Sequence, residues 1–116
     1  MDFKLKKAQG LQTVTAAKES ATVIEAGDLV AEDGSGYIIK ATAASTAIAW
    51  APNGAAAGET EVEVTVGNDF TLVGTADANF AIANKGTEVD MVVASTVQKV
   101  DLGESSTDVF LVGIAT

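Results

Sequence analysis

Residues 60–76 hold the clearest pattern of hydrophobic and polar positions in the chain, in the stretch TEVEVTVGNDFTLVGTA. Apolar side chains occupy every second position of one run and return after a Gly-Asn-Asp cluster. These apolar positions are Val62, Val64, Val66, Phe70 and Leu72. Alternation with a period of two is typical of a half-buried β-strand, and turn residues between two such runs are typical of a hairpin. The pattern therefore predicts a β-hairpin.

The register of this hairpin decides which side chains face the core. A three-residue turn pairs Val64 with Leu72 and puts all five apolar side chains on one face, so we expect this register. Glu61 and Glu63 then form an acidic pair on the solvent face. Val73 points outward, which indicates that the outer face is covered, as at a subunit contact.

Similar short apolar runs, separated by turn residues, recur along the rest of the chain. Strands are expected at 21–25, 29–31, 37–42, 47–51, 80–83, 88–94, 97–102 and 108–115. The last run is apolar enough to be buried on both faces. This regular spacing predicts an all-β protein, a single-domain sandwich or small barrel of about eight to nine short strands. Trp50, the single tryptophan, is expected to be a core or interface anchor.

Residues 1–20 differ in charge from the rest of the chain. They carry four lysines against two acids, whereas residues 21–116 carry three lysines against fourteen acids. A basic leader on an acidic body suggests a contacting arm. We therefore divide the chain into an extended N-terminal basic arm, 1–20, and a β-rich domain, 21–116. The alternatives are a short strand, a frayed tail, or an arm that orders on a partner by adding a strand to a sheet edge.

Composition excludes several classes of chemistry. The chain has no Cys and no His, and all seven of its basic residues are Lys. It therefore has no disulfide framework, no thiolate nucleophile and no histidine base or metal ligand. The absence of Arg and a net charge of -9 argue against nucleic-acid binding. We predict no cofactor.

The sequence also bears on where the protein is made. No apolar run approaches the roughly 20 residues of a membrane span, and no apolar stretch follows the N-terminal lysines as in a secretory signal. We expect a product of the host cytoplasm with no membrane contact, unless the sequence is a mature form whose leader has been removed.

Carboxylate pairs are the remaining catalytic material. Glu61 and Glu63, and also Glu88 and Asp90, lie two apart on expected strands, and glycosidases use two carboxylates. Acids on a strand face are far more often solvated surface, so no catalytic residue is assigned. The acidic turn at 32–36, EDGSG, lacks the ligand spacing of a calcium loop and is interpreted as a solvated turn with no metal.

The run GNDFTLVGTADANFAIANKGTEVDMV, residues 67–92, resembles small decoration (cement) proteins of tailed-bacteriophage heads. The positions that carry this likeness are Gly67, Phe70, Leu72, Phe80, Gly86 and Val89, with Ala26–Val30 and Val112–Ala115. The resemblance implies a non-enzymatic virion protein on the outer capsid surface. It would bind the major capsid protein, stabilise the expanded head and form a homo-oligomer, with a trimer favoured.

Within that hypothesis the arm is expected to dock on the capsid. Its apolar residues would supply burial and its lysines would meet acidic capsid surface; these residues are Phe3, Lys4, Leu5, Lys6 and Lys7. Trp50 and Val73 would anchor the subunit contact. Deleting residues 2–10 is expected to reduce capsid binding and leave the body folded.

Two other functions remain open from the sequence. One is an adhesion module of a phage tail or cell surface, a β-sandwich that binds carbohydrate through Trp50 and Tyr37. The other is a carboxylate hydrolase that uses Glu61 or Glu88.

Overall fold

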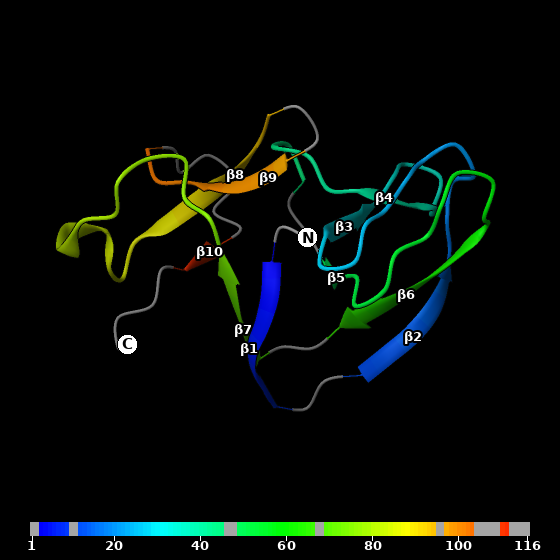
Figure 1. Ribbon diagram of the computed structural model, residues 1–116, viewed down its shortest axis with the longest axis horizontal. Coiled ribbons are helices and arrows are strands. Elements are labelled where there is room, and N and C mark those ends of the chain that lie inside the picture. The colour runs from blue at the N-terminus through cyan, green and yellow to red at the C-terminus, as the bar shows by residue number, and fades with distance from the viewer. Residues whose placement is uncertain are drawn as a thin grey trace.

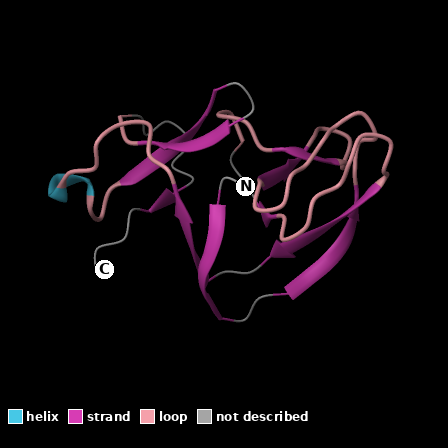
Figure 2. Cartoon of the chain, in the orientation of Figure 1, coloured by secondary structure: helices cyan, strands magenta, loops and turns pink. Residues whose placement is uncertain are grey.

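The computed structural model describes residues 3–9, 12–45, 49–66, 69–94, 97–103 and 110–111. Its strands are β1 (Phe3–Gln9), β2 (Gln12–Ala17), β3 (Leu29–Glu32), β4 (Ile38–Lys40), β5 (Ala49–Trp50), β6 (Glu61–Val66), β7 (Asp69–Gly74), β8 (Glu88–Ala94), β9 (Val97–Asp101) and β10 (Phe110–Leu111). One 3₁₀ turn, η1 (Ile82–Asn84), is the sole helical element of the described residues (Figures 1 and 2). The predicted all-β class is confirmed.

The strands form three antiparallel sheets. The five-stranded sheet has the order β2-β6-β5-β3-β4, the three-stranded sheet β10-β8-β9, and the third sheet is the pair β1-β7. The described strands do not close into a barrel. The five-stranded sheet lies at one end of the long axis and the β8–β10 sheet towards the other, with β1 and β7 between them (Figure 1).

A two-stranded ribbon connects the sheets. Gln12 pairs with Val66 in the five-stranded sheet, and Gln9 pairs with Asp69 in the β1-β7 sheet. The two pairings keep one register, and we call β1-β7 and β2-β6 together the ribbon. The residues that join them, 10–11 and 67–68, lie outside the described residues. An irregularity between Leu5 and Lys7 shifts the register by one residue near the end of the ribbon.

The predicted hairpin is wrong in its pairing. Val64 pairs with Val14 and Leu72 pairs with Leu5, so in the described structure β6 and β7 each pair with an N-terminal strand. β6 and β7 are not paired with each other among the described strands, because each finds its partner in the ribbon. Gly67 and Asn68 of the predicted turn lie outside the described residues. Val64 is buried as expected, whereas Val66 is 39% exposed.

Two apolar clusters form the core, one on each face of β3. Val30 belongs to one and Leu29 and Ala31 to the other, so β3 is buried on both sides. The first cluster contains Ile24, Val30, Ile38, Ala51, Ala55, Val62 and Val64. The second contains Phe3, Leu29, Ala31, Ala41 and Met91, with Trp50, Leu72, Val93, Val100 and Phe110 packed against it. The second cluster joins the three sheets.

The N-terminal segment is part of this body. Phe3 is 2% exposed, and its ring stacks on Phe110 with centroids 5.6 Å apart. A Cβ on Gly74 would lie 2.2 Å from the Phe3 ring, so the closely packed partner strand needs glycine there. Within the arm predicted at 1–20, residues 3–9 and 12–17 are thus two paired strands, because Phe3 packs in the core and the backbone pairs with β7 and β6.

The other predicted strands agree with the structure to different degrees. The ranges 29–31 and 88–94 are strands, whereas 21–25 contributes one isolated bridge, between Ile24 and Ala55. The range 80–83 overlaps η1 and is not a strand. Of the range 108–115 the structure describes 110–111. The expected burial on both faces is wrong at Leu111, which is 71% exposed, because β10 packs against the core with its Phe110 face alone.

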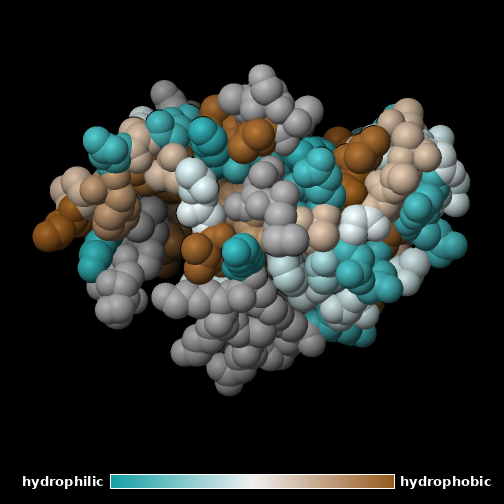
Figure 3. All heavy atoms as spheres, viewed as in Figure 1, coloured by the Kyte–Doolittle hydropathy of each residue, from teal (hydrophilic) through white to brown (hydrophobic). Residues whose placement is uncertain are grey.

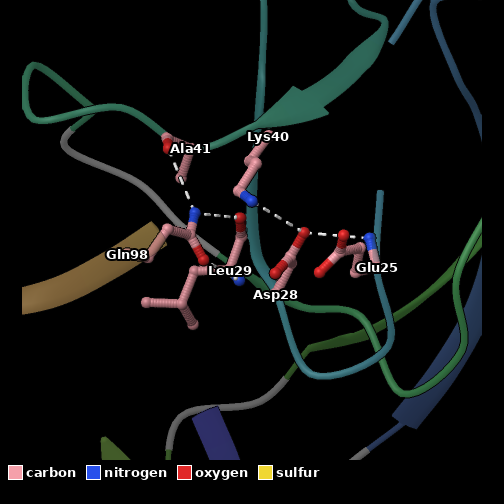
Figure 4. A network of polar contacts seen from close by, with 6 residues as sticks. All are labelled: Glu25, Asp28, Leu29, Lys40, Ala41 and Gln98. Atoms are coloured by element: carbon pink, nitrogen blue, oxygen red, sulfur yellow. Dashed lines mark hydrogen bonds and ion pairs between the residues drawn. The ribbon is translucent and has the colours of Figure 1, made fainter. Parts of the chain in front are cut away.

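Buried polar contacts tie β9 to the five-stranded sheet (Figure 4). Gln98 of β9 is fully buried; its Oε1 accepts the Leu29 N–H at 2.8 Å, and its Nε2 donates to the Leu29 carbonyl at 2.8 Å and the Ala41 carbonyl at 3.1 Å. Close by, buried Asp28 lies 3.3 Å from the Lys40 ammonium and accepts the Glu25 N–H at 2.9 Å. The network holds the start of β3 and the end of β4 in place.

Replacing Gln98 tests this link. We expect Gln98→Ala to lower the free energy of unfolding by about 3 kcal/mol, because it strands buried backbone groups at Leu29 and Ala41. Gln98→Met, which keeps the size but not the hydrogen bonds, is expected to cost about 2 kcal/mol. Urea unfolding measures both. The matched control is Gln12→Ala on the exposed face of β2; equal stability of the Gln98 and Gln12 variants would contradict the structure.

The integration of β1 changes the expected effect of truncation. Deleting residues 2–10 removes Phe3 from the core, so we expect the body to be destabilised by about 3 kcal/mol or more, as for other buried Phe deletions. Phe3→Ala should reproduce most of this loss in urea unfolding, and Lys4→Ala, at an exposed neighbour, should not. An unchanged unfolding midpoint in the truncated protein would show that β1 does not contribute to the fold.

Candidate functional site

The β1-β7 pair has one face in the core and one in solvent. Phe3 points into the core, and the next residue, Lys4, is exposed. Lys4 pairs across the strands with Val73, which is 51% exposed. Side chains opposite each other in an antiparallel pair lie on the same face. Lys4 and Val73 therefore form an exposed pair, a cation beside an apolar side chain, which we call the ribbon site.

The ribbon site contains two of the residues predicted as contacts. Lys4 was expected in the docking arm, and Val73 was expected to point outward, which is confirmed. The side chains of Leu5, Lys6 and Lys7 lie outside the described residues.

The other predicted anchor, Trp50, is used inside the protein. It is half-buried, packs against the cluster around Phe3, and its indole N–H donates to the Phe3 carbonyl at 3.2 Å. Of the two aromatic residues considered for carbohydrate, Tyr37 is 48% exposed. With its N–H bonded within the chain, Trp50 serves as a core anchor of β1.

The carboxylate pairs take different positions. Glu61 and Glu63 are exposed on β6, as expected, and line a shallow groove of about 340 Å³ with Asn53, whose amide donates to Glu63 at 3.1 Å. Glu88 is exposed, but Asp90 is 7% exposed. The second pair therefore does not present two carboxylates to one solvent-filled site.

The acidic turn at 32–36 has a structural role in the β3–β4 hairpin. The Asp33 carboxylate accepts the Ser35 N–H at 2.7 Å and the Tyr37 N–H at 3.0 Å, which closes the β3–β4 hairpin. Asp33 thereby acts as a turn residue. Among the residues that the structure describes, no group of three or more acids, histidines or cysteines lies close enough to hold a metal ion.

Lys18 and Lys40 are bonded within the protein. Lys18 is 1% exposed and its ammonium donates to the carbonyls of Glu19 and Thr22. Lys40 pairs with buried Asp28. Two cations are thus turned away from solvent, while Glu19, Glu32, Glu59, Glu61, Glu63, Asp77 and Glu88 are exposed. The ribbon site places a lysine on this predominantly acidic surface.

A second surface was not predicted from the sequence. One face of the five-stranded sheet carries an apolar concavity of about 720 Å³, lined by Val14, Ala16, Val30, Ala31, Glu32, Ile38, Ile39, Thr42, Ala44, Ser45, Ala49, Val64 and Val66. We call it the open face. Val14 and Val66 at its border are 37% and 39% exposed. The alternation in β6 predicts that Val66 points towards the core. It does not predict that this face of the sheet is left partly uncovered.

None of the described helical elements is long and apolar enough to cross a membrane. Comparison with known proteins adds no relatives: no family model, no curated protein and no solved structure matches the chain.

Proposed function

We propose that this chain is a non-enzymatic structural protein that binds the outer surface of a phage capsid and stabilises the expanded head. Its partner is the major capsid protein, and the ribbon site, Lys4 with Val73, makes the contact. The observation that supports this proposal is the exposure of this pair on two paired strands, which Phe3 anchors in the core. The resemblance of residues 67–92 to decoration proteins supplies the class of partner.

One of the two strands that carry the ribbon site leaves an edge open. On β1, the Phe3 N–H donates to the Gly27 carbonyl at 3.0 Å and the Phe3 carbonyl accepts the Trp50 indole N–H at 3.2 Å, so this edge is partly occupied. β7 has β1 as its one hydrogen-bonded neighbour among the described strands. An exposed strand edge is a template for an incoming extended segment, which pairs through its backbone. A capsid segment that adds to β7 would gain backbone hydrogen bonds, burial on Val73 and an ion pair with Lys4.

This contact needs no release of the N-terminal strand. Phe3 stays in the core while Lys4 faces outward, so docking costs no core burial and little ordering entropy. Val73 is assigned to the capsid contact because it lies beside Lys4 on one face.

Stabilisation of the head follows from mass action. A protein that binds the expanded shell and not its precursor stabilises the expanded shell by RT ln(1 + [L]/Kd). The chain itself supplies rigidity and contact surface, and no chemical step is required. Assembly as a homo-oligomer, with the trimer that the resemblance favours, would raise the avidity of such a module.

Co-sedimentation with expanded capsids of the phage that encodes the chain tests the proposal. Wild-type protein should pellet with expanded capsids and not with unexpanded procapsids. We expect Lys4→Glu and Val73→Asp each to weaken binding at least about tenfold, as for central contact residues. Val97→Asp, at a 41% exposed valine of β9, is the matched control.

The outcomes separate the two parts of this proposal. Wild-type protein that stays in the supernatant with expanded capsids would overturn the capsid function. Wild-type protein that pellets, together with Lys4 and Val73 variants that pellet equally well, would overturn the ribbon site. Unfolding in urea should confirm that the exposed substitutions leave the fold intact.

A further inference from the structure

The loop between β7 and β8 exposes an unbroken apolar stretch. Phe80 and Ile82 are 51% and 83% exposed, and the alanines at 81 and 83 are also exposed. We call residues 80–83 the apolar tip. A run of exposed apolar residues costs solubility and is unusual without a contact function. The tip lies at one extreme of the long axis, where η1 is drawn in Figure 2 and hydrophobic atoms protrude in Figure 3.

The tip is held by hydrogen bonds rather than by burial. The Ala81 N–H donates to the Asn84 side chain at 2.8 Å, the Asn84 N–H to the Ala81 carbonyl at 2.9 Å, and the Lys85 N–H to the Ile82 carbonyl at 3.1 Å. Thr87 donates twice to the Asn84 carbonyl. Because the turn is already ordered, inserting Ile82 into a partner costs little conformational entropy.

The chain also has an apolar concavity, the open face, that could receive the apolar tip of another copy. The open face is a wide concavity of about 720 Å³ with a mostly aliphatic lining. Its border residues Val14 and Val66 are partly exposed, so filling it would remove apolar surface from both partners.

Charge at the two surfaces is complementary. Glu32 is exposed and lines the open face, on the same side of the sheet as Ile38, with which it pairs. Lys85 directly follows the 3₁₀ turn, three residues after Ile82. The tip thus carries a cation beside its apolar residues, and the open face carries a carboxylate at its border.

We infer that the apolar tip of one copy inserts into the open face of a second copy. The two surfaces lie towards opposite ends of a molecule 43 Å long, so they do not meet within one chain (Figure 1). A contact between different surfaces of identical chains is heterologous and propagates head to tail, closing into a ring where the rotation allows. Each copy then buries its tip and fills its concavity.

The other occupants fit the observations less well. Two large apolar side chains give little membrane affinity, and a net charge of -9 disfavours anionic lipid surfaces. A separate apolar ligand would fill the concavity but leave the tip exposed. The contact between copies accounts for both surfaces together, and it does not depend on the capsid proposal.

Sedimentation equilibrium of the purified protein tests the contact. Wild-type protein should associate with concentration, and Ile82→Asp and Val66→Asp should each weaken association at least about tenfold. Val23→Asp, at a 53% exposed valine outside both surfaces, should not. Glu32→Lys should weaken association, and adding Lys85→Glu in the same chain should restore it. A wild-type monomer at all concentrations, or an oligomer unaffected by Ile82→Asp, would overturn the inference.

Cysteine cross-linking gives the direction of the contact, since the native chain has no Cys. Mixing Ile82→Cys protein with Val14→Cys protein under mild oxidation should give a disulfide-linked heterodimer. Mixing Ile82→Cys with Val23→Cys is the matched control and should give little. Equal yields in both mixtures, or Ile82→Cys homodimers in excess of the heterodimer, would show that the tip does not enter the open face.

Discussion

The side-chain amide of Gln98 pairs with backbone groups inside the protein, as the backbone of a neighbouring strand would. It pairs with both the N–H and the carbonyl of Leu29 and reaches the Ala41 carbonyl, all without solvent. A buried polar group is stabilising only when its partners are complete, and here they hold β9 against β3 and the end of β4. The position of the three-stranded sheet, and of the loop before it that carries the tip, depends on this contact.

The ribbon is the second constraint. The β1-β7 and β2-β6 pairings share one register, although they belong to two different sheets. Phe3 at the far end of the ribbon packs with Leu29, Met91 and Phe110, so the ribbon and the Gln98 link meet in the same cluster. The ribbon site is rigid because its other face is part of this core.

Alternation along the sequence predicted which residues form strands, but not which strands pair. The pattern at 61–66 and 69–74 was correct for strands, and the exposure of Glu61, Glu63 and Val73 followed from it. A period of two fixes the face of each side chain and carries no information on the partner strand. The same alternation fits a pairing of the two strands with each other or with other strands, and the N-terminal strands are the partners observed.

The sites depend on this same difference between local and long-range information. Lys4 and Val73 are each visible as outward residues, yet their juxtaposition requires the β1-β7 register. The open face requires β2, whose residues looked like a loose tail, to lie beside β6. The tip at 80–83 looked like a strand, but backbone hydrogen bonds from Asn84 and Lys85 turned it outward. The ribbon site and the open face are assembled from strands far apart in the sequence, whereas the tip is a local segment whose turn the alternation pattern did not predict.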